Sequence, residues 1–190
     1  MRLGRFALVA CLALPLVVWA STRIPAPAGT TWLELTDAES GRRILARALR
    51  QGEEVVLTWK NSLFGLMVTE VFVARAGILE LTRVTFADPA GGEPPRVRPS
   101  DVKDLYQTGG PFQAEGLSRP VRHVVFRVGE IGDPRIKIGR EVVQLVREVG
   151  FGGAVVMGAR RPTLHERIVG WFTSERRGAS PSPGGFGGSG

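Results

Sequence analysis

The chain has 190 residues, of which 43% are hydrophobic and 23% are charged, and these proportions predict one folded domain with tails rather than a disordered chain. The formal net charge is +7, which favours weak attraction to anionic surfaces but does not indicate a nucleic-acid partner. The single cysteine, Cys11, lies in an apolar leader, which excludes a cysteine-ligated cofactor and disulfide bonds within the folded body.

The first twenty residues carry the pattern of an export signal. Arg2 and Arg5 form a short basic start, and residues 6–20 are free of charge. This run of 15 residues matches the apolar core of a signal peptide, about 7–15 residues, better than a membrane-spanning helix of about 20 residues. We therefore expect an exported, periplasmic or extracytoplasmic protein, with residues 1–20 either cleaved after Ala20 or retained as an N-terminal membrane anchor.

A tether and a β-rich body follow the leader. Residues 21–30 are rich in proline and alanine and are expected to be the tether, and residues 31–160 are expected to form the extracytoplasmic domain. Residues 43–49 fit either a strand or two turns of helix. Elsewhere, alternation of apolar and polar residues predicts strands at 32–37, 54–60, 68–75, 78–86, 123–128 and 154–157, with a hairpin over 135–142.

The clearest hairpin signal is the pair Ala76–Gly77, which separates two β-rich runs. In the second run, 78–86, the parity of the apolar residues changes after Leu81. Such a change predicts either a bulge near Arg83 or burial of both strand faces.

Helical patterns are few and short. Residues 88–121 contain six prolines and are expected to form a long loop, with one helical turn that Ser100 caps. Apolar residues at helical spacing predict a short helix over 142–149, which ends at Gly150. Together these elements predict a mostly β fold: a small antiparallel β-sandwich or open barrel with an N-terminal signal or anchor helix and a short C-terminal helix.

The last thirty residues differ from this body in composition. Residues 161–177 are expected to form a basic amphipathic helix that begins at Thr163, with Glu166 completing a capping box. Residues 178–190 are rich in glycine, serine and proline and are expected to be a disordered tail. The candidates for contact with a membrane surface are Arg167, Trp171 and Phe172.

No set of side chains in the sequence specifies an enzyme. His123 is the one candidate base for a hydrolase, and it is expected to share a strand face with Arg127 rather than with an acid. Because no histidines and carboxylates show zinc-ligand spacing, we expect neither a metal site nor a cofactor. The chain has one tyrosine, and export would separate it from the genome, so we also expect no nucleic-acid partner.

One segment resembles the signature of a protein family. Residues 58–72 (TWKNSLFGLMVTEVF) are similar to the signature of an uncharacterised family of small exported β-rich proteins, a domain of unknown function. Its members are often encoded beside the fused permease of TRAP transporters that use a TAXI-type solute-binding protein. Residues 127–139 also resemble the late hairpin of this family. The residues that match the signature are Ser62, Val68, Glu70 and Phe72.

The resemblance implies an exported accessory protein whose partner is a transporter permease or its solute-binding protein. It also implies a binding surface formed by Asn61, Ser62 and Glu70. Three positions depart from the pattern: Asn61 and Pro134 stand where the family has histidines, and Met67 stands where it has a proline. Chemistry that depends on these histidines in relatives would therefore be lost in this chain.

From these observations we expect a non-enzymatic extracytoplasmic accessory protein. Two alternatives remain open: an envelope protein that lies on anionic lipid through its basic C-terminal helix, and a hydrolase. Glu70 carries the sharpest hypothesis, because a carboxylate on the apolar face of the strand 68–75 is unfavourable unless it is paired. Either Glu70 accepts hydrogen bonds from the turn at Asn61 and Ser62, or it lies exposed at a sheet edge.

Overall fold

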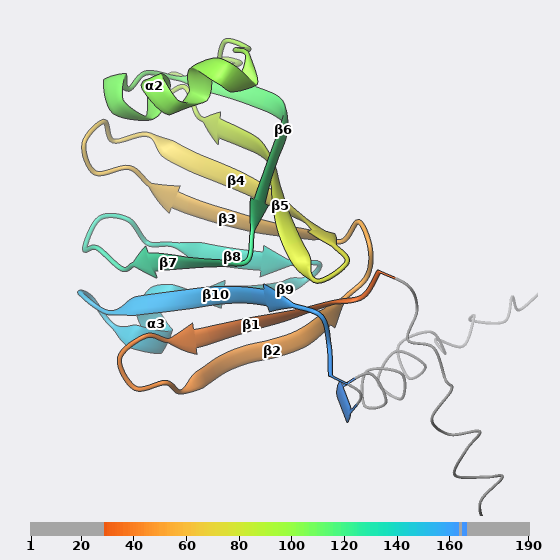
Figure 1. The fold of residues 1–190 in the computed structure, drawn as a ribbon. Helices are drawn as coiled ribbons and strands as arrows, with labels where there is room; N and C mark the ends of the chain where they lie inside the picture. Colours follow the sequence, from red (N-terminus) through yellow and green to blue (C-terminus); the bar gives the residue numbers. More distant parts are fainter. Residues whose placement is uncertain (1–28, 164, 167–190) are drawn as a thin grey trace, which may run out of the picture.

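The structure is a computed structural model, and it describes residues 29–163, 165 and 166. In this part of the chain, ten strands form two antiparallel sheets (Figure 1). The strands are β1 (Thr31–Asp37), β2 (Arg43–Leu49), β3 (Glu54–Lys60), β4 (Met67–Arg75), β5 (Ile78–Phe86), β6 (Phe112–Val121), β7 (His123–Arg127), β8 (Arg135–Ile138), β9 (Glu141–Gln144) and β10 (Ala154–Arg160). The prediction of a mostly β, antiparallel sandwich is confirmed.

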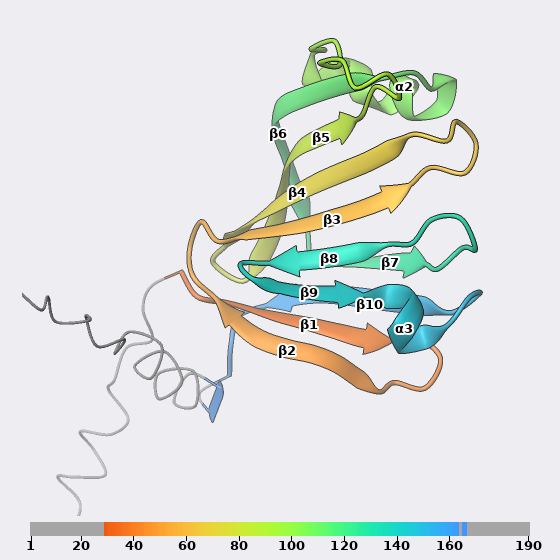
Figure 2. The ribbon, with the colours of Figure 1, turned by 180° about the vertical axis from the view of Figure 1, so that it is seen from behind.

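One sheet has six strands in the order β6-β5-β4-β3-β8-β9, and the other has four in the order β2-β1-β10-β7. The two sheets lie face to face over β8, β9, β7 and β10, which Figure 2 shows from behind. Because side chains alternate between strand faces, each strand contributes every second residue to the layer between the sheets. The buried side chains of this layer include Leu33, Leu35, Leu57, Ile136, Val155 and Met157.

The hairpin between β4 and β5 forms as predicted. Its two turn residues, Ala76 and Gly77, have φ angles of 43° and 95°, which are typical of the tight turn that joins twisted antiparallel strands. The predicted bulge is also present, because Val71 pairs with Arg83 whereas the next residue of β4 pairs with Leu81. The skipped residue, Thr82, donates a hydrogen bond from its hydroxyl to the carbonyl of Val71. Leu79 and Val84 are therefore both buried despite their opposite parity.

The sequence of residues 43–49 fits either a strand or two turns of helix, and in the structure this segment is a strand. The prediction of a helix over 142–149 is wrong in its first half, since residues up to Gln144 belong to β9 and pair with β8. Only α3 (Leu145–Val149) is helical, and it ends at Gly150 as predicted. Backbone pairing with β8 outweighs the helical spacing there, because the hairpin places both strands in register before the chain turns.

The expectation of a long loop over 88–121 is also wrong in part. The segment contains a short 3-10 helix, η1 (Pro99–Asp101), then α2 (Val102–Thr108), and then the ten residues of β6. Pro120 is tolerated in β6 because this strand is at the edge of its sheet and β5 is the only strand beside it among the described residues. The bulge that follows Glu115 breaks the alternation that would have revealed the strand.

Ser100 does not cap a helix. Pro99 already begins the 3-10 turn, and the hydroxyl of Ser100 donates to the carboxylate of Asp101 at 2.8 Å instead. The helix α2 that follows lies over one end of the six-stranded sheet, beyond the region that the four-stranded sheet covers (Figure 1). Val102 is buried there, and Tyr106 is half-buried against the core.

Both ends of the described body lie at the same end of the sandwich. Trp32 and Arg160 are register partners in β1 and β10, and the guanidinium of Arg160 lies 5.9 Å from the centroid of the Trp32 ring. The reciprocal hydrogen bonds of the predicted capping box are present between Thr163 and Glu166. The expected leader 1–20, nearly all of the tether, and residues 167–190 lie outside the described residues. Within the described part, no helix has the length and apolarity needed to cross a membrane.

Candidate functional site

Glu70 lies on the inner face of the six-stranded sheet. In β4 it alternates with Val68 and Phe72, which are both buried in the core. Its register partners are Leu57 in β3 and Val84 in β5, and both of these are buried as well. The carboxylate is therefore half-buried among apolar side chains, which a charged group tolerates only with polar partners.

The partner of Glu70 is Tyr106, which α2 supplies from above the sheet. The phenol O–H of Tyr106 donates to Oε1 of Glu70 at 2.6 Å. The ring of Tyr106 is held by edge-on contact with Phe86, at 5.1 Å between centroids, and Phe86 stacks on Phe112 at 4.6 Å. This aromatic cluster fixes the hydroxyl of Tyr106 over the carboxylate.

Burial raises the pKa of Glu70 above its ordinary value, whereas the hydrogen bond from Tyr106 and the charge of Arg119 act to lower it. The pKa of Tyr106 is also raised, first by burial and then by the negative charge of Glu70. Tyr106 therefore stays protonated at any physiological pH, and its O–H donates a hydrogen bond to the carboxylate. The pair can hold a negative charge in a partly buried position.

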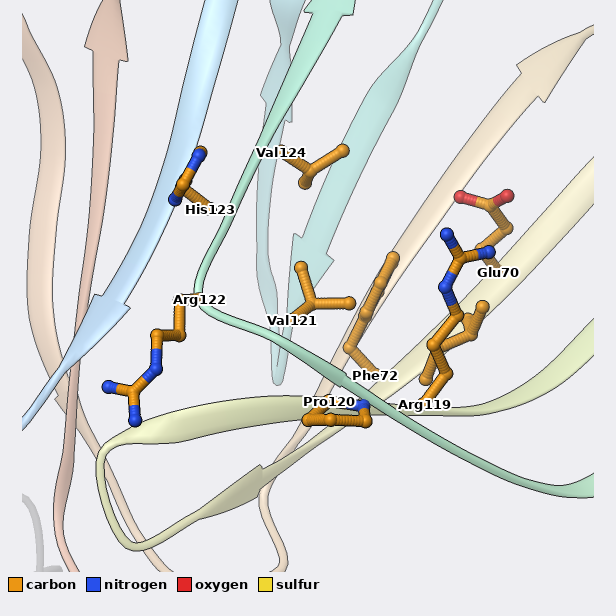
Figure 3. A pocket seen from close by; sticks show the side chains of 9 residues that line it. Glu70, Phe72, Arg119, Pro120, Val121, Arg122, His123 and Val124 are labelled. Carbon is orange, nitrogen blue, oxygen red and sulfur yellow. The ribbon is translucent and has the colours of Figure 1, made fainter.

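A pocket of about 310 Å³ opens beside Glu70 (Figure 3). Its apolar walls come from β4, β5 and the continuous segment of β6 and β7, and they include Phe72, Val121 and Val124. Arg119 extends toward Glu70 across this pocket (Figure 3). Arg122 and His123 also line the pocket, although their side chains turn to the other side of the same segment (Figure 3).

The structure does not bring the predicted binding residues together. Asn61 is only 8% exposed, and its Oδ1 accepts hydrogen bonds from the backbone N–H groups of Leu63 and Phe64 at 2.9 and 3.1 Å. Ser62 is exposed in the same turn. The amide of Asn61 thus closes its own loop, and the prediction that this turn donates to Glu70 is wrong.

Tyr106 and Arg119 are the site residues that the sequence did not reveal. Tyr106 lies 36 residues from Glu70 along the chain, in the segment whose prolines predict a loop. Its only sequence signal is that it is the single tyrosine and stands four residues after an apolar residue, Val102, at helical spacing.

A second surface is formed by loops at one end of the sandwich, opposite to Thr31 and Arg160 (Figure 1). The loops between β3 and β4 and between β7 and β8 lie side by side, because the N–H of Lys60 donates to the carbonyl of Gly132 at 2.8 Å. The turn before β10 joins them through the hydrogen bond from Gly152 to Val128. We call this surface the loop end, and its exposed apolar side chains are Leu63, Phe64, Met67, Ile131 and Phe151.

The loop end holds most of the exposed apolar side chains of the described body. Seven large apolar residues are exposed in this part of the chain, and five of them belong to the loop end. Leu63 is 83% exposed, Phe151 is 64% exposed and Ile131 is 58% exposed. Single exposed apolar residues are ordinary, but a cluster of them in adjacent loops marks an interaction surface.

The remaining predicted sites give no chemistry in the described residues. His123 is exposed and has no carboxylate as a hydrogen-bond partner there, so nothing orients it as a base. No group of three or more histidine, cysteine or acidic side chains is placed to hold a metal ion within the described ranges. Arg167, Trp171 and Phe172 lie outside them. Comparison of the chain with protein-family models, with curated proteins and with solved structures finds no match in any of the three.

Proposed function

We propose that this chain is an exported, non-enzymatic binding module that captures a protein partner with its loop end. The observation that carries the proposal is the gathering of Leu63, Phe64, Met67, Ile131 and Phe151 on adjacent loops of a rigid sandwich. Loops on a β-scaffold present side chains at the surface without disturbing the core, which is why binding residues concentrate on them.

The position of the chain ends supports a protein rather than a lipid as the partner. Thr31 and Arg160 lie at the end of the sandwich opposite to the loop end (Figure 1). If residues 1–20 are retained as an anchor, the membrane lies beyond Thr31, and the loop end points away from it. The partner in this proposal is a TAXI-type solute-binding protein of a TRAP transporter, because that partner moves freely in the same compartment whereas the permease is confined to the membrane.

Site-specific photo-crosslinking in cells that produce the full chain tests the proposal. A photoreactive phenylalanine analogue in place of Leu63 should give a discrete crosslinked product that contains the solute-binding protein. The matched control is Val125, which is 54% exposed on β7 and lies outside the loop end. Equal products from both positions, or no product from Leu63 in a stably folded chain, would contradict the proposal.

A second candidate function is contact with an anionic membrane surface through residues 161–177. It is favoured by the pairing of Trp32 with Arg160, because this pairing makes the basic segment begin beside the tether. Binding of the full chain to phosphatidylglycerol vesicles should then fall as the salt concentration rises. Replacement of Arg167, Arg176 and Arg177 by glutamine should weaken it, and replacement of three arginines of the body, Arg43, Arg83 and Arg98, should not.

A further inference from the structure

The pocket beside Glu70 contains two opposite charges that do not meet. Oε1 of Glu70 accepts the hydrogen bond of Tyr106, but no hydrogen bond or ion pair joins Glu70 to Arg119 within the described residues. Arg119 is nonetheless close enough for its charge to act on the carboxylate. Each of these two groups therefore keeps unused hydrogen-bonding capacity that faces the same space (Figure 3).

Other arginine and glutamate side chains of this protein behave differently. Arg47 closes onto Glu53 at 2.8 Å, and Arg75 closes onto Glu80 at 3.0 Å. Both of these ion pairs are partly exposed, so each one stabilises the fold only modestly, and the two ion pairs nevertheless form. The carboxylate of Glu70 has only the hydrogen bond of Tyr106 among the described residues, so the space between Glu70 and Arg119 can admit the charged groups of a ligand.

We propose that this pocket binds a small zwitterion with an aliphatic body, such as an aliphatic α-amino acid. The ammonium group would donate to the free oxygen of Glu70, and the carboxylate would accept from the guanidinium of Arg119. The aliphatic body would lie against Phe72, Val121 and Val124. A volume of about 310 Å³ holds a molecule of this size and is at the small end of ligand sites.

The charges of the pocket select against simpler ligands. A cation alone would bring its charge toward Arg119, and an anion alone would bring its charge toward Glu70. A ligand that carries both charges satisfies both groups at once, whereas each of the others leaves one of them unpaired. This inference goes beyond the proposed function, because it uses the interior of the sandwich rather than the loop end.

Isothermal titration calorimetry of the full-length chain tests the inference with four probes. L-leucine is the zwitterion, 4-methylpentanoate lacks its ammonium group, 3-methylbutylamine lacks its carboxylate, and glycine lacks its aliphatic body. We expect saturable binding of L-leucine and at least tenfold weaker binding of the other three. Absence of saturable L-leucine binding, or equal binding of any probe that lacks one feature, would overturn the proposal.

Variants locate the site. Arg119→Gln and Glu70→Gln should each weaken L-leucine binding at least tenfold. The matched control is Arg127→Gln, because this exposed arginine belongs to the neighbouring β7 but does not line the pocket. Arg119 is exposed, so its replacement tests binding without disturbing the fold, which a thermal melt checks. An equal loss in Arg127→Gln, or no loss in Arg119→Gln, would contradict the assignment.

Discussion

The interior of this protein has two parts that differ in what covers the six-stranded sheet. Where the four-stranded sheet lies over it, the layer between them is aliphatic, and residues such as Leu35, Leu57 and Met157 are almost fully buried. Where only α2 lies over it, the cover is aromatic and carries a hydroxyl group. Tyr106 and Glu70 belong to this second part.

The difference follows from the size of the cover. A second sheet brings a row of side chains from every strand, and these pack densely against the side chains of the first sheet. A helix of seven residues brings little more than one face of two turns, and the pocket beside Glu70 is lined by β4, β5, β6 and β7 rather than by this helix. The carboxylate of Glu70 on the inner face of the sheet is therefore tolerated where Tyr106 of this helix reaches it, and the proposed ligand lies in the pocket beside that carboxylate.

The largest expected effect belongs to the part between the sheets. Leu57 is fully buried in β3, so Leu57→Ala removes three buried carbon atoms and leaves a cavity that the two sheets cannot close. We expect a loss of about 2–5 kcal/mol in the free energy of unfolding. Urea denaturation of the parent and of the variant measures this loss.

The matched control for Leu57 is Leu63, which is the same residue type but 83% exposed at the loop end. Leu63→Ala should change the free energy of unfolding by less than about 0.5 kcal/mol. Similar losses from the two variants would show that the loop end is part of the core, and the contrast between interior and loop end would fail.

The sequence predicts best those parts whose structure is decided locally. The strands β3 and β5 and the turn at Ala76–Gly77 form as expected, because strand alternation and a left-handed turn are set by neighbouring residues. The bulge opposite Val71 is also visible in the sequence as a change of parity. None of these features needs a distant partner.

The candidate site depends on contacts that the sequence does not encode locally. Glu70 is visible as an acid in an apolar strand, but its partner Tyr106 lies 36 residues away in a helix that sits among prolines. The sequence predicts that Asn61 donates to Glu70, whereas its side chain accepts hydrogen bonds from the backbone of its own turn. A local partner for an amide is always available, which is why proximity in sequence was misleading here.

The second effect in size concerns the part under α2. Tyr106→Phe removes the O–H that reaches Glu70 at 2.6 Å and leaves a half-buried carboxylate without that donor. We expect a loss of about 1–3 kcal/mol in the free energy of unfolding at neutral pH. Urea denaturation of the variant measures it, and far-ultraviolet circular dichroism checks that the fold is kept.

A double-mutant cycle with Glu70→Gln isolates the interaction. The loss from Tyr106→Phe should be smaller in the Glu70→Gln background, because a neutral amide costs less to leave unpaired than a carboxylate. If the two losses are equal, the ring of Tyr106 stabilises the fold through packing alone, and the polar character of this part of the interior has no energetic consequence.

The smallest effect is a dependence on pH, and its sign separates an interior carboxylate from a surface one. The pKa of Glu70 is raised by burial above its ordinary value of 4.5, so the folded chain holds this proton more firmly than the unfolded chain. The free energy of unfolding of the parent, relative to Glu70→Gln, should therefore fall as the pH rises from 4.5 through the pKa of the folded state.

Glu80 provides the opposite case on the surface. Hydrogen bonds from Ser118 and Arg75 lower its pKa below 4.5, so the stability that its ionised form contributes is present above pH 4.5 and is lost as the pH falls through the folded pKa. Relative to Glu80→Gln, the parent should thus lose stability toward low pH, whereas relative to Glu70→Gln it should gain. Urea midpoints of the three proteins between pH 3 and pH 7, at fixed salt, measure both slopes. Slopes of the same sign would mean that Glu70 is solvated like Glu80, and the pocket would then lack the dry carboxylate on which the proposed ligand depends.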